Sequence, residues 1–166
     1  MRYMIGGGIA FLLALVQASS VEQFKVLGVT PNLLLVLLVS WLVVRGLEDV
    51  LPILAVAGVT LGLVGLQAPG VVLLALLPIA GLGIVRELGV IHSELVLVLL
   101  LVAGASLAYE TVVLMSLMVT GGGYDVLRAA NEVVLPAAIV NLAIVPPVYL
   151  FMRLARPAAP RRGFAS

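Results

Sequence analysis

The sequence predicts an all-α membrane protein with six transmembrane helices, and three observations support this. Of the 166 residues, 63% are hydrophobic and only 10% are charged, and the mean hydropathy is +1.30. A soluble domain of this length could not remove so much apolar surface from water. The apolar residues also fall into six runs with short connections between them, so lipid is the expected solvent for most of the chain.

The six runs form one predicted transmembrane domain, residues 1–154. The expected helices cover residues 4–18, 31–44, 50–66, 71–85, 95–119 and 132–153. Residues 155–166 are rich in arginine and proline and predict a disordered basic tail in the cytoplasm.

The first run, Met1–Ser20, also has the pattern of a secretory signal peptide, with an early arginine, an apolar stretch and small residues after it. We expect a retained helix instead. Small residues recur at every fourth position and form a face that another helix can approach closely: Gly6, Ala10, Ala14 and Ala18.

The second, third and fourth helices are short. Thr30 before Pro31 predicts the start of the second helix, because proline at the first helical position loses no needed N–H. Gly58 and Gly62 give the third helix a Gly-x-x-x-Gly packing face, and Pro78 is expected to kink the fourth. With roughly 14 to 17 apolar residues against about 20 for a full span, these helices either lie inside the bundle or thin the bilayer locally.

The fifth helix carries Glu110 close to its middle, in a run of 25 residues with no other charge. A carboxylate at the membrane centre costs on the order of 2.5–3.5 kcal/mol, so it requires a function or a partner. The alternatives are an ion or proton relay, an anchor for a partner helix, or a neutral acid hydrogen-bonded inside the bundle. We expect the last two, with Asn141 as the hydrogen-bond partner and with contributions from Tyr109 or Ser106.

The distribution of Lys and Arg predicts that both termini lie in the cytoplasm. With six spans, Arg2, Arg45, Arg86, Arg153, Arg156, Arg161 and Arg162 share one side of the membrane, and Lys25 and Arg128 lie on the other. The positive-inside rule assigns the side with more positive charge to the cytoplasm.

The sequence offers no constellation typical of an enzyme. It has one histidine, His92, and no cysteine, and its glycine runs lack the strand and helix context of a phosphate loop. We therefore expect no catalytic residues, no metal, no cofactor and no nucleic-acid surface.

Three segments resemble the rod shape-determining protein MreD family. Gly28-Val29-Thr30-Pro31-Asn32-Leu33-Leu34-Leu35, followed by Arg45-Gly46, is similar to the start of that family's second helix. Tyr109-Glu110 resembles its Tyr-Glu pair in the fifth helix, and Pro136 with Asn141 resembles its P-x-x-x-x-N sixth helix. The chain departs from the family at Gln67, where many members carry aspartate, and at Val140, where many carry tyrosine.

The resemblance implies a fold like the S components of energy-coupling factor transporters, and a non-enzymatic scaffold in the bacterial inner membrane. The implied partner is MreC, with RodA, a class B penicillin-binding protein and MreB in the wider cell-elongation complex that makes peptidoglycan. The residues that we expect to serve helix packing or partner binding are Gly6, Ala10, Ala14, Gly28, Pro31, Asn32, Gly58, Gly62, Tyr109, Glu110, Pro136 and Asn141.

The alternative function is a substrate-capture S component of an energy-coupling factor transporter. Such a protein needs an extracytoplasmic pocket with several polar side chains. The sequence offers few: Glu22, Gln23, Gln67, Tyr124, Asp125, Arg128 and Asn131.

Overall fold

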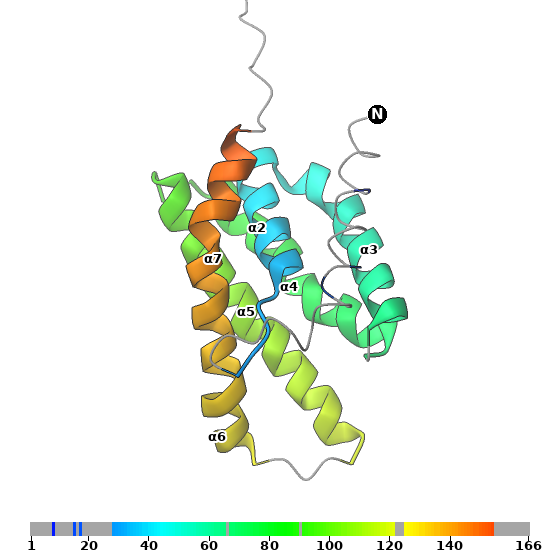
Figure 1. Ribbon diagram of the computed structural model, residues 1–166. Coiled ribbons are helices and arrows are strands. Elements are labelled where there is room, and N and C mark those ends of the chain that lie inside the picture. The colour runs from blue at the N-terminus through cyan, green and yellow to red at the C-terminus, as the bar shows by residue number, and fades with distance from the viewer. Residues whose placement is uncertain are drawn as a thin grey trace, which may run out of the picture.

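The structure is a computed structural model that describes residues 8, 15, 17, 28–65, 67–89, 91–121 and 125–154. The regular elements of this part of the chain are all helices, which confirms the predicted all-α class for it (Figure 1). They are α2 (Leu33–Arg45), α3 (Leu47–Val64), α4 (Pro69–Glu87), α5 (Glu94–Val119), α6 (Val126–Ala129), the π-helical turn η1 (Ala130–Val134) and α7 (Leu135–Leu154).

Four helices in this part of the chain are long and apolar enough to cross a membrane. They are α3, α4, α5 and the continuous helical stretch Leu127–Leu154, which includes η1 and α7. The predicted first helix, 4–18, lies outside the described residues except for Gly8, Leu15 and Gln17, all of which are helical. The predicted packing residues Gly6, Ala10 and Ala14 and the tail 155–166 also lie outside them.

The sixth predicted helix begins earlier in the structure than the sequence indicated. The predicted start was residue 132, whereas helical backbone begins at Val126 in the structure. The side chain of Asp125 accepts hydrogen bonds from the backbone N–H groups of Leu127 and Arg128, so an acid caps this start. The extra residues pass through η1, in which the hydrogen-bonding pattern widens before α7 continues.

The short helix α2 lies at the centre of the bundle. Every residue from Leu34 to Val44 is buried, and α2 packs against α3, α4, α5 and α7. A helix that is apolar around its whole circumference is most stable when other helices surround it. The prediction that a short helix lies inside the bundle is therefore correct for α2. Trp41 is buried as well, with the Arg45 guanidinium 5.8 Å from its ring centre.

Small residues allow α3 and α4 to form a tight hairpin. A Cβ atom added at Gly62 would overlap the backbone of Pro69, and one added at Gly58 would overlap the Leu73 side chain. Gly83 of α4 lies against the Leu47 side chain at the other end of the hairpin, where an added Cβ would be 3.0 Å from the nearest atom. The packing face that the sequence predicted on the third helix therefore contacts α4 of the same chain.

Polar contacts align the other helices at the end of the bundle where α2 ends. Arg86 of α4 donates from Nε to the carbonyl oxygen of Val43 at 3.0 Å, which satisfies a carbonyl in the last turn of α2. The Tyr149 hydroxyl of α7 donates to Glu94 Oε2 at the start of α5, at 2.9 Å. The end of α4 thus meets the end of α2, and the start of α5 meets the end of α7.

Replacing Gly62 by alanine tests the hairpin packing. Gly62→Ala should lower the free energy of unfolding by about 1–3 kcal/mol, because the new methyl group meets backbone that cannot rotate away. Gly104→Ala is the matched control: Gly104 is also helical, but no atom lies within 4 Å of its added Cβ. Thermal unfolding in detergent, followed by circular dichroism, should show a lower midpoint for the first variant alone. Equal midpoints would contradict the packing role.

Candidate functional site

A group of polar side chains, three of them buried and one half-buried, joins four segments of the chain inside the bundle. We call Gln17, Asn32, Ser106 and Asn141 the polar node. Asn141 of α7 is 1% exposed and makes two hydrogen bonds in it. Its Oδ1 accepts from the backbone N–H of Asn32 at 2.7 Å, and its Nδ2 donates to Ser106 Oγ of α5 at 3.0 Å.

The polar node also caps the start of α2. Asn32 is the N-cap residue, and its Oδ1 accepts from the backbone N–H of Leu35 at 3.0 Å. Gln17 donates from Nε2 to the same Oδ1 and accepts from the backbone N–H of Leu34, both at 3.0 Å. Side chains therefore satisfy backbone donors of Asn32, Leu34 and Leu35, three groups that a helix start otherwise leaves without partners.

The polar node lies at mid-depth of the long helices. Ser106 is at the middle of the 26-residue α5, so α2 starts inside the bundle and runs only toward one end, as Figure 1 shows. The residues before the start, Gly28 to Pro31, are not helical, and Gly28 has a φ of +82° that favours glycine. Non-helical backbone at membrane depth is tolerated where protein surrounds it. The predicted helix start at Thr30-Pro31 is two residues too early.

Glu110 has a different environment from the one the sequence suggested. The expected partner was Asn141, but the Asn141 side chain bonds Asn32 and Ser106 instead. Tyr109, by contrast, is 8% exposed and contacts the side chain of Asn32. Glu110 is half-buried, and no hydrogen bond or ion pair joins its carboxyl group to another described side chain. The expected Glu110–Asn141 bond was therefore wrong.

The other predicted site residues are distributed over the fold. Pro31 is half-buried just before the polar node, and Gly28 is exposed. Pro136 is half-buried in the first turn of α7, one turn before Asn141 on the same helix. Gly58 and Gly62 lie against residues of α4. Neither lies against a residue of the polar node. The structure thus brings Asn32, Tyr109 and Asn141 together and leaves the others apart.

A polar cleft of about 320 Å³ lies at the end of the bundle where α2 ends. It is lined by two cations and three acids together with the turn between α2 and α3: Arg45, Gly46, Leu47, Glu48, Asp49, Arg86 and Glu87. Gly46 has a φ of +103°, which allows the sharp turn there. The acids at the start of α3 and the cations at the ends of α2 and α4 complement the helix dipoles. Favourable placement at helix ends therefore explains why most of these charged residues lie together.

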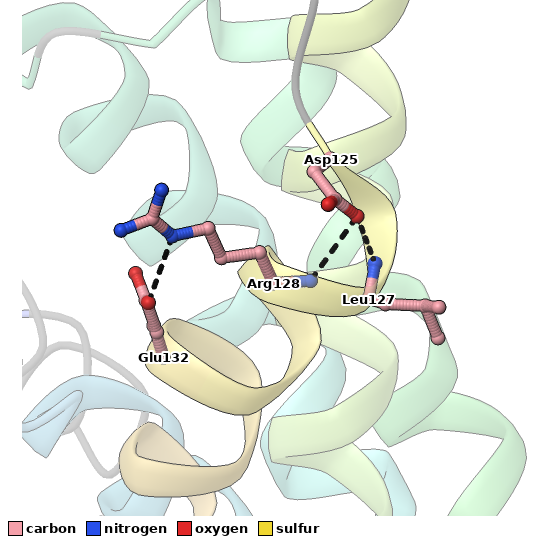
Figure 2. A network of polar contacts seen from close by, with 4 residues as sticks. All are labelled: Asp125, Leu127, Arg128 and Glu132. Atoms are coloured by element: carbon pink, nitrogen blue, oxygen red, sulfur yellow. Dashed lines mark hydrogen bonds and ion pairs between the residues drawn. The ribbon is translucent and has the colours of Figure 1, made fainter.

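A second charged group lies at the opposite end of α7. Figure 2 shows Asp125 over the N–H groups of Leu127 and Arg128, and the Arg128 guanidinium beside Glu132. The Arg128 Nε to Glu132 Oε1 distance is 2.9 Å, but both side chains are more than half exposed. An exposed pair one helical turn apart contributes only about 0.3–0.5 kcal/mol. This group stabilises α6 and η1 locally.

The chemistry available in the polar node is that of neutral amides and hydroxyls. Asparagine, glutamine and serine here donate to and accept from backbone and each other, and they position helices rather than activate a nucleophile. Within the described residues no group of three or more His, Asp or Glu side chains could hold a metal ion.

Three residues of these sites have a larger structural role than the sequence indicated. Gln17 and Ser106 are isolated polar residues in apolar runs, and that isolation was the available signal. The sequence indicated Arg86 only as a positive charge on one side of the membrane. Nothing in the sequence indicates that its side chain reaches Val43, which is 43 positions away.

Removing the Asn141 amide tests the polar node. Asn141→Leu should lower the free energy of unfolding by about 1–3 kcal/mol, because it leaves the Asn32 N–H without an acceptor in a buried place. Asn131→Leu is the matched control, since Asn131 is exposed on η1. Thermal unfolding in detergent compares the two variants with the parent protein. Equal effects of the two substitutions would refute a special role for Asn141.

Comparison with family models, with curated proteins and with solved structures found no match to this chain.

Proposed function

We propose that this protein is a non-enzymatic membrane scaffold of the bacterial cell-elongation machinery, similar to the MreD family. In this proposal it binds MreC in the cytoplasmic membrane and helps to organise peptidoglycan synthesis by RodA and a class B penicillin-binding protein along MreB filaments. The six-helix arrangement with both termini in the cytoplasm belongs to the same proposal. The cleft lined by Arg45 and Arg86 would then face the cytoplasm, in accord with the positive-inside rule.

The resemblance rests on three segments that are far apart in the sequence, and one residue from each lies in or against the polar node. Asn32 comes from the first segment, Tyr109 from the second and Asn141 from the third. Residues that hold one structural centre together are expected to vary less freely than lipid-facing residues. The convergence therefore supports a shared fold as the reason for the resemblance.

The environment of Glu110 is the observation that supports the partner-binding part of the proposal. Glu110 lies next to the polar node on α5, half-buried, and makes no hydrogen bond or ion pair to another side chain in the described part of the chain. An acid at this depth costs on the order of 2.5–3.5 kcal/mol unless a donor reaches it. A polar residue on the transmembrane helix of MreC could supply that donor, which makes Glu110 the proposed anchor.

Substitution of Glu110 tests the anchor. Glu110→Leu should reduce recovery of MreC with the tagged protein, because a lost interhelical hydrogen bond of about 1–2 kcal/mol weakens binding roughly 5- to 30-fold. Glu110→Gln should be milder, since an amide can still donate and accept. The measurement is co-purification from the source host in mild detergent, quantified by mass spectrometry.

Thr111→Leu is the matched control for that experiment. Thr111 is the adjacent residue, it is exposed on α5, and its hydroxyl donates only to the Leu107 carbonyl of its own helix at 2.6 Å. Equal recovery of MreC with the parent, Glu110→Leu and Thr111→Leu proteins would contradict the anchor. Recovery of a paired ATPase and a coupling subunit, in place of MreC, would support the alternative, a substrate-capture S component.

A further inference from the structure

The helices of the bundle have two very different lengths. The hairpin helices α3 and α4 contain 18 and 19 residues, whereas α5 contains 26 and the helical stretch Leu127–Leu154 contains 28. At about 1.5 Å per residue the hairpin helices are roughly 27–28 Å long, and the other two roughly 39–42 Å.

The difference falls at one end of the molecule. Arg86 joins the end of α4 to the end of α2, and only Gly46 separates α2 from α3. Tyr149 joins the end of α7 to the start of α5. The turn between α4 and α5 is short, so all the long helices are level at this end. The α3–α4 turn must then lie about 11–12 Å short of the opposite end of α5. Figure 1 shows this turn ending well before the α5–α6 connection.

The α3–α4 turn also lacks the residues that mark a membrane surface. From residue 50 to residue 85 the chain contains no Asp, Glu, Lys, Arg or His. The α5–α6 end, by contrast, carries Asp125, Arg128 and Glu132, all exposed. The turn is thus uncharged, with Gln67 as its one polar side chain among the described residues from Gly65 to Gly70.

The outer faces of the two helix pairs are apolar over different heights. Exposed apolar residues on α3 extend from Leu51 to Val64, about 20 Å, whereas those on α5 extend from Leu95 to Val119, about 36 Å. A typical hydrocarbon core is about 30 Å thick. The α5 side matches a full bilayer with some tilt. The exposed apolar stretch of α3 is roughly 10 Å shorter than the hydrocarbon core, although α3 and α4 as whole helices, at roughly 27–28 Å, come close to its thickness.

We infer that the α3–α4 hairpin thins the bilayer locally, by drawing inward the headgroups of the leaflet on the side of its turn. The occupant of this face is lipid, and lipids with short acyl chains fit it best. Two features support lipid as the occupant: the exposed face is continuous and apolar, and the glycines that could receive a close partner helix on α3 are already filled by α4. The inference does not depend on MreC binding.

The depth of the turn in a bilayer tests the inference. The chain has no native cysteine, so single cysteines at Ala68 and, in a second variant, Gln67 can carry nitroxide spin labels. The labelled proteins are reconstituted in dioleoyl phosphatidylcholine vesicles, and collision with a water-soluble nickel chelate is compared with collision with oxygen. Asp125→Cys gives the aqueous reference, and Leu107→Cys, exposed at mid-span on α5, gives the hydrocarbon reference.

We expect the nickel-to-oxygen ratio at Ala68 and Gln67 to lie near the Asp125 value. We also expect it to shift toward the Leu107 value in long-chain dierucoyl phosphatidylcholine, because thinning of a thicker bilayer costs more free energy. A ratio equal to that at Leu107 in dioleoyl vesicles would overturn the inference, since the turn would then lie in hydrocarbon. Weak collision with both reagents would overturn it too, because protein would then cover the turn.

Discussion

The start of α2 inside the bundle is the constraint on which the rest of the structure depends. Backbone N–H groups at this depth have no water to bind, and each one left without an acceptor costs several kcal/mol. Asn32, Gln17 and Asn141 supply the acceptors, and Ser106 orients the amide of Asn141. One cap therefore ties together an N-terminal residue, α2, α5 and α7.

The remaining helices follow from covering α2. Because α2 is apolar on every side, α3, α4, α5 and α7 must all pack against it. The two longest helical stretches, α5 and Leu127–Leu154, cross the polar node and extend past the start of α2. Helices α3 and α4 are joined by a short turn and stop earlier. The glycines of α3 allow the hairpin to close on itself, which leaves its outer face to lipid. The unequal lengths of the helices give the molecule two sides that fit bilayers of different thickness.

The neighbouring residues Tyr109 and Glu110 have different roles: Tyr109 is part of the internal packing, and Glu110 is the proposed partner-binding residue. Tyr109 points to the polar node and is buried against Asn32, so it belongs to the internal cap. Glu110, one residue later, is rotated by about 100° around the helix axis and is only half-buried. A scaffold requires both kinds of residue: polar groups satisfied internally, which make the bundle rigid, and a polar group that remains available to another helix. This division is the physical basis of the proposed role of Glu110.

The sequence by itself determined the all-helical class, because long apolar runs in this proportion are expected to form helices in lipid. It predicted short third and fourth helices, at residues 50–66 and 71–85, whereas α3 and α4 contain 18 and 19 residues and are long enough to cross a membrane. The buried position of the short α2 was one of two alternatives that the sequence left open, and the tertiary structure selected it. The sequence also indicated Asn32, Tyr109 and Asn141 as important. Only the tertiary structure decided their partners: Asn141 bonds Asn32 and Ser106 instead of Glu110, and the glycines of α3 contact α4. A polar residue in an apolar run must find a donor or an acceptor. Which partner it reaches depends on how each helix is rotated and how deep it lies in the bundle. The local sequence of an apolar helix encodes neither its rotation nor its depth.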